Sequence, residues 1–181
     1  FELKLLREIL YKVEINSVVG NTSLSINKIE FDSRLISDGD MYIAITGVNV
    51  DGHSFISQAI KNGANCIVCE KIPDNKTDGV VYVNVKSSRK ALAIISSNYF
   101  DNPSSKLNLI GVTGTNGKTT IATLLFDLYT ELEIKSGLIS TVKISYDNKN
   151  FQANQTTPDS LSINRFSVSY THLRAHETSE N

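Results

Sequence analysis

Alternating apolar and polar positions predict short strands along the first hundred residues. In the run at 26–31, Ile29 and Phe31 fall on one face while Lys28 and Glu30 fall on the other, which is the two-residue period of a strand. Similar short apolar runs predict further strands at 13–19, 41–45, 66–69 and 80–85.

Helical spacing predicts the segments between these strands. Apolar residues three and four apart indicate an amphipathic helix at 3–10 and another from Ser54, which Gly63 ends. Ser87 and Ser88 open a third helix, since serine side chains cap the free N–H groups of a first helical turn. Because strands and helices alternate, the sequence predicts an α/β domain with a largely parallel sheet.

A second unit is expected after residues 101–105, where Asp-Asn-Pro-Ser-Ser combines a proline with polar turn residues. Beyond this boundary we expect a strand at 107–113, a well-buried helix at 118–132 and a strand at 138–142, connected by a right-handed crossover. The predicted organisation is a mixed α/β domain at 1–102, followed at 103–167 by the opening β–loop–α–β unit of a second α/β domain.

Residues 168–181 differ in character from the rest of the chain. They have no apolar period and resemble a translated sequencing adapter, so we interpret them as a non-native tail. His172 and His176 stand four apart, the spacing of two metal ligands on one helical face, but no third ligand accompanies them. We therefore expect no metal there.

Composition narrows the classes of function. The 181 residues are 40% hydrophobic and 20% charged, with a net charge of -1. A near-neutral chain lacks the broad basic surface that binds nucleic acid, and no apolar run reaches the roughly 18 residues of a membrane span. No signal-peptide layout is present at the N-terminus. We expect a cytoplasmic monomer that neither binds nucleic acid nor enters a membrane.

Cys66 and Cys69 have the C-x-x-C spacing of metal and redox sites. They fall within a predicted buried strand, where positions three apart point to opposite faces. A structural zinc also needs four ligands, and the sequence has no second cysteine pair. We interpret both as free cysteines of the core.

A glycine-rich motif lies between the strand predicted at 107–113 and the helix predicted at 118–132. Glycines allow a tight turn that presents N–H groups to phosphate oxygens, and the helix N-terminus adds partial positive charge. In such a loop Lys118 would reach the β- and γ-phosphates as the catalytic cation, and the Thr119 hydroxyl would bind Mg²⁺. The residues expected to bind the nucleoside triphosphate are Gly114, Thr115, Asn116, Gly117, Lys118, Thr119 and Thr120.

The motif departs from the strict phosphate-loop pattern at one position. That pattern requires glycine at 112, where Val112 stands, and the nearest glycine is Gly111. A chance glycine-rich turn is the alternative interpretation, but the predicted strand before and helix after the motif favour the phosphate loop.

The run Val-Thr-Gly-Thr-Asn-Gly-Lys-Thr-Thr at 112–120 resembles the ATP loop of the Mur ligases, the ATP-dependent amino-acid ligases of peptidoglycan synthesis. Upstream, the chain is similar to the N-terminal uridine-nucleotide domain of two members, which add the third residue and the terminal D-Ala-D-Ala. Thr-Thr-Pro-Asp at 156–159 resembles a segment of the third-residue ligase. The upstream similarity rests on Asp32-Ser33-Arg34, Gly39-Asp40, Gly47, Asp51-Gly52-His53 and Gly63-Ala64, and the resemblance as a whole covers about residues 1–166.

The resemblance implies which residues hold the UDP-muramyl dipeptide. Purely structural roles remain open for neighbouring residues. Asp32 and Asp51 could shape turns, and Arg34 could be a structural ion-pair partner. His53 could cap or pack rather than contact substrate. The uridine diphosphate would lie around Phe31, Ser33, Val48, Asn49 and Val50, and the muramyl-peptide end near Gln155, Thr156 and Thr157.

The implied activity is ATP-dependent ligation through an acyl phosphate, with Mg²⁺ and with meso-diaminopimelate, or else L-lysine, as the amino acid added. In the family, a glutamate and a histidine that bind magnesium, a carbamylated lysine and the amino-acid pocket lie further along than this chain extends. We therefore expect the 181-residue chain to be inactive and the activity to belong to its full-length parent.

Rival functions explain less of the sequence. The ligase that adds D-Ala-D-Ala shares the upstream motifs. Folylpolyglutamate synthases and cyanophycin synthetases share the loop but not the region before it. A kinase or GTPase would not account for Asp32-Ser33-Arg34 or the Thr-Thr-Pro segment, and a pure nucleotide-sugar module would have no use for Lys118 and Thr119.

Overall fold

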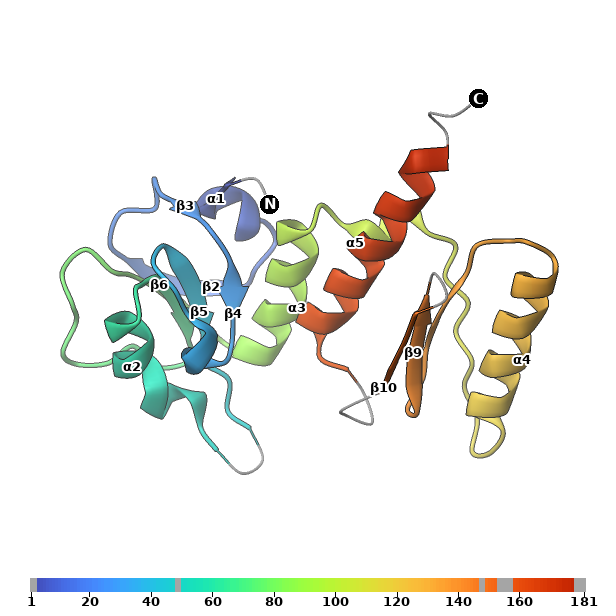
Figure 1. Cartoon of the computed structure of the whole chain (residues 1–181). Coiled ribbons are helices and arrows are strands. Elements are labelled where there is room, and N and C mark those ends of the chain that lie inside the picture. Colours follow the sequence, from blue (N-terminus) through green and yellow to red (C-terminus); the bar gives the residue numbers. More distant parts are fainter. Residues whose placement is uncertain (1–2, 48–49, 147–148, 153–157, 178–181) are drawn as a thin grey trace. The chain divides into compact units, whose positions relative to one another are not determined.

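The computed structural model describes residues 3–47, 50–146, 149–152 and 158–177. It divides into two compact units, Phe1–Asp101 and Asn102–Asn181 (Figure 1). Among the described residues, no helix is both long and apolar enough to cross a membrane.

The first unit is built on a five-stranded sheet of order β2-β7-β6-β5-β4. Adjacent strands from β4 to β7 run parallel, and β2 joins the edge antiparallel to β7. The predicted, largely parallel sheet is confirmed. Its strands are β2 (Ile15–Val19), β4 (Ile29–Glu30), β5 (Asp40–Ile43), β6 (Ala64–Cys69) and β7 (Val81–Val85); β1 (Lys4–Leu5) and β3 (Ser25–Ile26) form a separate pair.

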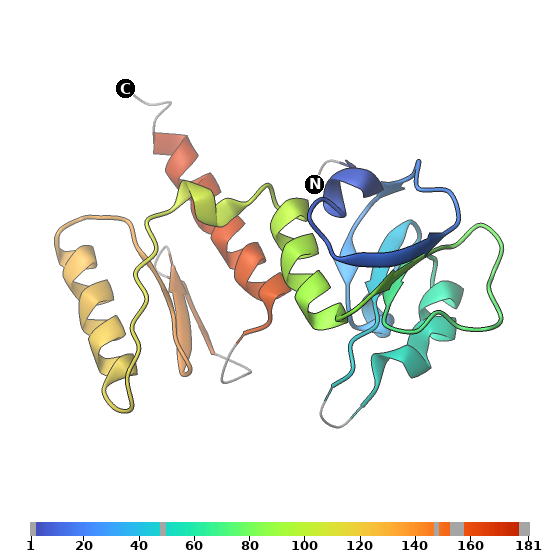
Figure 2. The ribbon, with the colours of Figure 1, turned by 180° about the vertical axis from the view of Figure 1, so that it is seen from behind.

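Helices cover both faces of this sheet (Figures 1 and 2). Helix α2 (Ile56–Lys61) lies on one face, and α1 (Leu6–Ile9) and α3 (Ser88–Tyr99) lie on the other. Strands buried on both faces are apolar almost throughout. Cys69 packs in the cluster on the α2 side while Cys66 points to the opposite face, and both are fully buried. The interpretation as core cysteines is confirmed.

Two predicted elements of the first unit are shorter than expected. The strand predicted at 26–31 is split because Ile26 pairs with Lys4 whereas Ile29 pairs with Met41, so the chain changes partners between them. The helix predicted at 3–10 is limited to α1, because Lys4 and Leu5 are drawn into β1.

Two boundaries agree with the sequence. The Ser87 hydroxyl accepts a hydrogen bond from the Lys90 N–H at 3.4 Å and caps α3, as predicted. After α2, Gly63 adopts φ +108°, and a Cβ at this position would lie 2.6 Å from Asp38 Cα. Glycine is therefore required where α2 ends.

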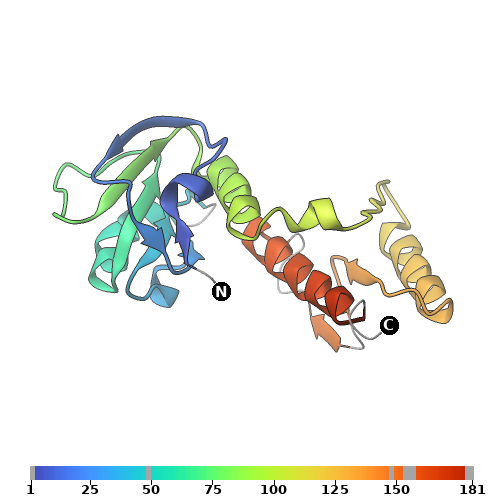
Figure 3. The same cartoon turned by 90° about the horizontal axis from the view of Figure 1, so that it is seen from above.

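The second unit contains an antiparallel sheet of order β10-β9-β8 with a helix on either side (Figures 1 and 3). The Tyr146 and Phe166 rings, 6.3 Å apart, connect β9 with α5, while Lys143 lies over the Phe126 ring of α4. The elements are η3 (Pro103–Lys106), α4 (Lys118–Glu131), β8 (Gly137–Ile139), β9 (Lys143–Tyr146), β10 (Lys149–Gln152) and α5 (Ser160–Glu177).

Two predictions for the second unit are wrong. Residues 107–113 form no strand, because among the described residues no neighbouring strand offers them a ladder of hydrogen bonds. The expected β–loop–α–β unit therefore lacks its first strand and consists of the loop, α4 and β8. Helix α4 is also not well buried, and Ile121, Leu124 and Leu128 are 50–62% exposed. The three-stranded sheet covers only part of the apolar face of α4.

Helix α5 continues to Glu177 across residue 168, where the sequence changes character. Leu161, near its start, is buried. The origin of residues 168–181 stays a prediction.

Candidate nucleotide-binding sites

The glycine-rich loop leads directly into α4. Gly117 is the N-cap residue and adopts φ +76°, and no side chain caps the helix. The first-turn N–H groups of α4, those of Lys118, Thr119 and Thr120 among them, have no intrahelical partner and point toward the loop. Such a helix N-terminus binds anions. A Cβ on Gly117 would meet nothing within 4 Å, so the backbone angle, not space, requires glycine here.

Lys118 lies back across the loop. Its ammonium group donates to the Gly114 carbonyl oxygen and, at 3.2 Å, to that of Thr115. Thr115 and Asn116 are exposed beside it. The lysine charge is thus held on the same side of the helix terminus as the open N–H groups.

The Thr119 hydroxyl lies 3.5 Å from the hydroxyl of Thr141, which sits between β8 and β9. Two hydroxyl oxygens suit the oxygen preference of Mg²⁺. No group of three or more His, Cys, Asp or Glu side chains in the described part of the chain could hold a metal. Sequence reasoning did not identify Thr141, because it lies 22 residues from Thr119 and belongs to no motif.

A second candidate site follows from the strand directions of the first unit. The parallel strands β4 to β7 all end on the same side of the sheet, and open α/β folds bind ligands at the carboxyl ends of such strands. We call this side of the sheet the carboxyl edge. Phe31 and Ser33 follow β4, and Val50 lies in the loop after β5. Three predicted residues therefore occupy this edge. The other predicted contacts, Val48, Asn49, Gln155, Thr156 and Thr157, lie outside the described residues.

Asp32 and Arg34 hold the turn after β4. The Asp32 carboxylate accepts from the Arg34 N–H at 3.0 Å and pairs with its guanidinium at 2.9 and 2.7 Å. The Arg34 hydrogen bond holds the pKa of Asp32 below its usual value. Ser33, between them, is 6% exposed, and its carbonyl accepts from Asn62 at 2.8 Å. Asp32 therefore caps the turn and pairs with Arg34, as the structural alternatives expect, while the substrate contact of Ser33 stays a prediction.

The loop after β5 closes on a narrow base, defined by Thr46, Gly47, Val50 and Asp51. Thr46 and Asp51 form an antiparallel bridge, and the Gly47 N–H donates to the Val50 carbonyl at 2.9 Å. We call these four residues the loop base. Next to it, a Cβ on Gly52 would lie 2.7 Å from the Ile45 nitrogen, so only glycine fits.

Tyr42, a buried residue of β5, contacts the residue that follows the loop base. Its hydroxyl donates to the Gly52 carbonyl at 2.9 Å. Burial, followed by the nearby carboxylates of Asp32 and Asp51, raises the pKa of Tyr42 to about 12.

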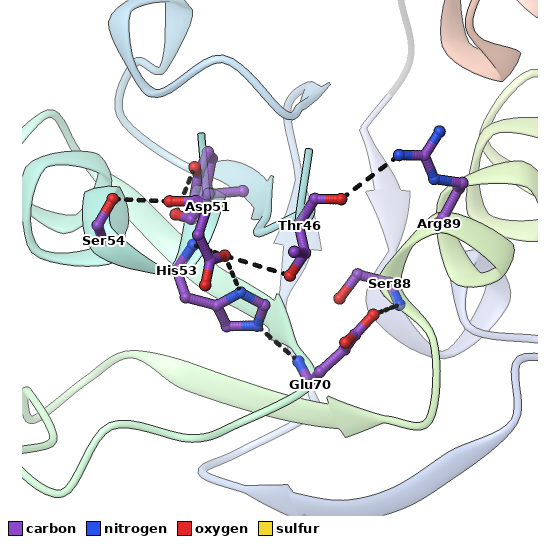
Figure 4. Close-up of polar contacts among 9 residues, drawn as sticks. Thr46, Asp51, His53, Ser54, Glu70, Ser88 and Arg89 are labelled. Atoms are coloured by element: carbon purple, nitrogen blue, oxygen red, sulfur yellow. Dashed lines mark hydrogen bonds and ion pairs between the residues drawn. The ribbon is translucent and has the colours of Figure 1, made fainter. Parts of the chain in front are cut away.

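His53 is held by the protein through both ring nitrogens (Figure 4). Nδ1 lies 2.7 Å from Asp51 Oδ1, and Nε2 accepts from the Glu70 N–H at 2.9 Å. The favoured interpretation, that His53 packs or caps rather than contacts substrate, agrees with this arrangement. Sequence reasoning identified neither Glu70, which His53 contacts, nor Arg89, which donates to the Thr46 carbonyl.

The fold and the loop place the chain among α/β nucleotide-binding proteins. A family model described as "Mur ligase family, catalytic domain" matches residues 25–100, and one described as "Mur ligase middle domain" matches residues 112–180. The chain belongs to the Mur ligase family, which confirms the resemblance found in its motifs.

Curated relatives that the chain matches include ligases named for 2,6-diaminopimelate. The chain is 48% identical over 161 residues to the UDP-N-acetylmuramoyl-L-alanyl-D-glutamate--2,6-diaminopimelate ligase of Cytophaga hutchinsonii, and 43% identical over 162 residues to that of Clostridium tetani. Each match covers 88% of this chain and 33% of the relative. The chain thus spans about a third of the length of these relatives.

Solved structures share the fold. A structure of a UDP-N-acetylmuramoyl-L-alanyl-D-glutamate--2,6-diaminopimelate ligase matches with a TM-score of 0.72 at 21% identity, over 95% of this chain and 34% of that one. The MurF ligase of Thermotoga maritima in complex with ADP matches with a TM-score of 0.50 at 29% identity, over 76% and 28%.

Proposed function

We propose that the protein to which this chain belongs is an ATP-dependent ligase of peptidoglycan synthesis. It joins meso-diaminopimelate to UDP-N-acetylmuramoyl-L-alanyl-D-glutamate. The observation that carries the proposal is the 48% identity with a ligase named for this reaction. The chain also has a phosphate loop that leads into a helix without a side-chain cap. L-Lysine is the second candidate for the added amino acid, and no relative reported above is named for it.

The phosphate loop would bind ATP. The open N–H groups at the start of α4 fit the phosphate oxygens, and the similar Thermotoga maritima ligase carries ADP. Lys118 would move from its loop carbonyls to the β- and γ-phosphates, where its charge stabilises the transferred phosphoryl group. Mg²⁺ would neutralise the remaining phosphate charge, and the Thr119 hydroxyl would be one of its ligands.

In the proposed reaction a carboxylate oxygen of the muramyl dipeptide attacks the γ-phosphorus, and ADP leaves. The amine of the incoming amino acid then attacks the acyl carbon, phosphate leaves, and the amine proton is released. Within this chain, Lys118 and the first turn of α4 orient the triphosphate for the first step.

The carboxyl edge of the first unit would bind the uridine nucleotide. Phe31, Ser33 and the loop that contains Val48, Asn49 and Val50 are the proposed contacts, with Gln155, Thr156 and Thr157 at the muramyl-peptide end. Arg89 is a cation at this edge that, among the described residues, pairs with no carboxylate. An unneutralised guanidinium favours a diphosphate nearby. We expect a cytoplasmic monomer.

Thermal denaturation of the 181-residue chain with added nucleotides tests this assignment. ATP with Mg²⁺ and UDP-muramyl dipeptide should each raise the midpoint, because a ligand that binds only the folded state stabilises it. GTP should act more weakly, and no phosphate should be released. Stabilisation by GTP alone would instead support a GTPase, and no response to UDP-muramyl dipeptide would remove the substrate assignment.

A further inference from the structure

The two arms of the loop after β5 are bonded to each other. Thr46 Oγ1 donates to Asp51 Oδ1 at 3.3 Å, and the Gly52 N–H donates to the Ile45 carbonyl at 2.9 Å. These contacts hold the two arms of the loop together. They do not fix the loop relative to the other strands that end at this edge.

His53 supplies that connection. Its Nδ1 must carry the proton, since a carboxylate oxygen only accepts, and its Nε2 must be unprotonated, since the Glu70 backbone N–H only donates. The ring is therefore a neutral imidazole in one tautomer. It connects the loop base after β5 with the end of β6, and the side chain is 17% exposed.

Glu70 and Arg89 extend the connection to α3 (Figure 4). The Glu70 carboxylate accepts from the Ser88 N–H at 2.9 Å, at the N-terminus of α3. From the next residue, Arg89 Nη2 donates back to the Thr46 carbonyl at 3.4 Å. The contacts run from Thr46 through Asp51, His53, Glu70 and α3 back to Thr46. They form a closed ring of polar contacts around the carboxyl ends of β5, β6 and β7.

We propose that His53 is a positioning residue, which holds the loop base in the conformation that receives the uridine nucleotide. The inference rests on the proposed function for the identity of the ligand, but not for the geometry. His53 acts through Asp51 and contributes no atom to the ligand, because both of its ring nitrogens are already engaged. Binding is stronger when the loop does not have to be ordered on association.

Two variants and one control test the proposal. His53→Phe keeps a ring of similar size but removes both hydrogen bonds, and His53→Gln keeps a donor and an acceptor. Asn84→Ala is the control, since the Asn84 amide donates to the Glu70 carbonyl at 2.8 Å without touching the loop base. Amide exchange of the 181-residue chain reports on the Gly47 and Gly52 N–H groups, and the Met41 N–H, bonded to Lys28 at 2.8 Å, reports on the core.

In His53→Phe, we expect exchange at Gly47 and Gly52 to accelerate by at least about 2- to 10-fold, the size of one lost neutral hydrogen bond, with Met41 unchanged. In the full-length enzyme, KM for UDP-muramyl dipeptide should rise by a similar factor while kcat and KM for ATP stay the same. His53→Gln should recover part of each effect, and Asn84→Ala should show neither.

Equal acceleration at Met41 would mean that His53 only stabilises the fold and would overturn the proposal. Unchanged exchange at Gly47 and Gly52, or an equal rise in KM for ATP, would do the same. If the wild-type chain fails to bind UDP-muramyl dipeptide, the proposed substrate is wrong, while the exchange data still decide whether His53 holds the loop base.

Discussion

The Lys118 ammonium group donates a hydrogen bond to the Thr115 carbonyl oxygen at 3.2 Å, so the lysine folds over the loop that precedes its own helix. The backbone N–H groups of the first turn of α4 are open on the same side. A cation and several aligned donors are thus gathered at one helix N-terminus. This arrangement is the geometric basis for placing a triphosphate there.

Replacing Lys118 should abolish most of the ligase activity. In the full-length enzyme, we expect Lys118→Ala to lower kcat by on the order of 10²- to 10³-fold, since it removes a charge that stabilises the transition state. Lys106→Ala, which removes an exposed lysine of the same unit, is the control. Steady-state phosphate release measures both, and near-normal turnover by Lys118→Ala would refute the loop assignment.

Ser33→Ala should affect one substrate selectively. A lost hydrogen bond to a charged group costs roughly 1.5–3 kcal/mol, or about 10- to 150-fold, and we expect this as a rise in KM for UDP-muramyl dipeptide. Ser57→Ala, at an exposed position of α2, should change neither KM. Because Ser33 is only 6% exposed, an equal loss for both substrates would show that its role is to support the turn.

The neighbours of a sequence motif and its long-range partners were not equally predictable. The Ser87 cap and the Gly63 stop depend on residues within a few positions, and both were predicted correctly. The strand at 107–113 depends on a partner strand that no local pattern specifies, and that prediction was wrong.

The same contrast holds at the candidate sites. The phosphate loop is a contiguous motif, so the sequence alone indicated it. The bond from His53 to Glu70 joins residues 17 apart, and that from Thr46 to Arg89 joins residues 43 apart. Only the sheet register brings these residues to one edge, which is why the sequence suggested a packing role for His53 without its partner.

The two cysteines should resist modification in the folded chain. Burial raises the pKa of both thiols, that of Cys69 to about 11. Since the thiolate is the reactive form, we expect no labelling by iodoacetamide at pH 8 in buffer and labelling of both in concentrated urea. Mass spectrometry counts the adducts. Rapid labelling of either cysteine in buffer would contradict its placement in the core.

Acid should weaken the turn that follows the loop base. Hydrogen bonds from the backbone and ring of His53 hold the pKa of Asp51 below its ordinary value. A carboxyl whose pKa is lowered by folding stabilises the fold above its unfolded pKa of about 3.9, and this contribution is lost as pH falls through the folded value. Carboxyl-carbon NMR should therefore show Asp51 titrating at lower pH in buffer than in urea. Coincident titrations would show that the bonds from His53 do not form.

Substrate-dependent phosphate release by the full-length enzyme tests the central claim most directly. We predict release from ATP only when UDP-N-acetylmuramoyl-L-alanyl-D-glutamate and meso-diaminopimelate are both present, with much slower release when L-lysine or D-Ala-D-Ala replaces diaminopimelate. Release that needs no uridine nucleotide, or that prefers D-Ala-D-Ala or lysine, would contradict the assignment.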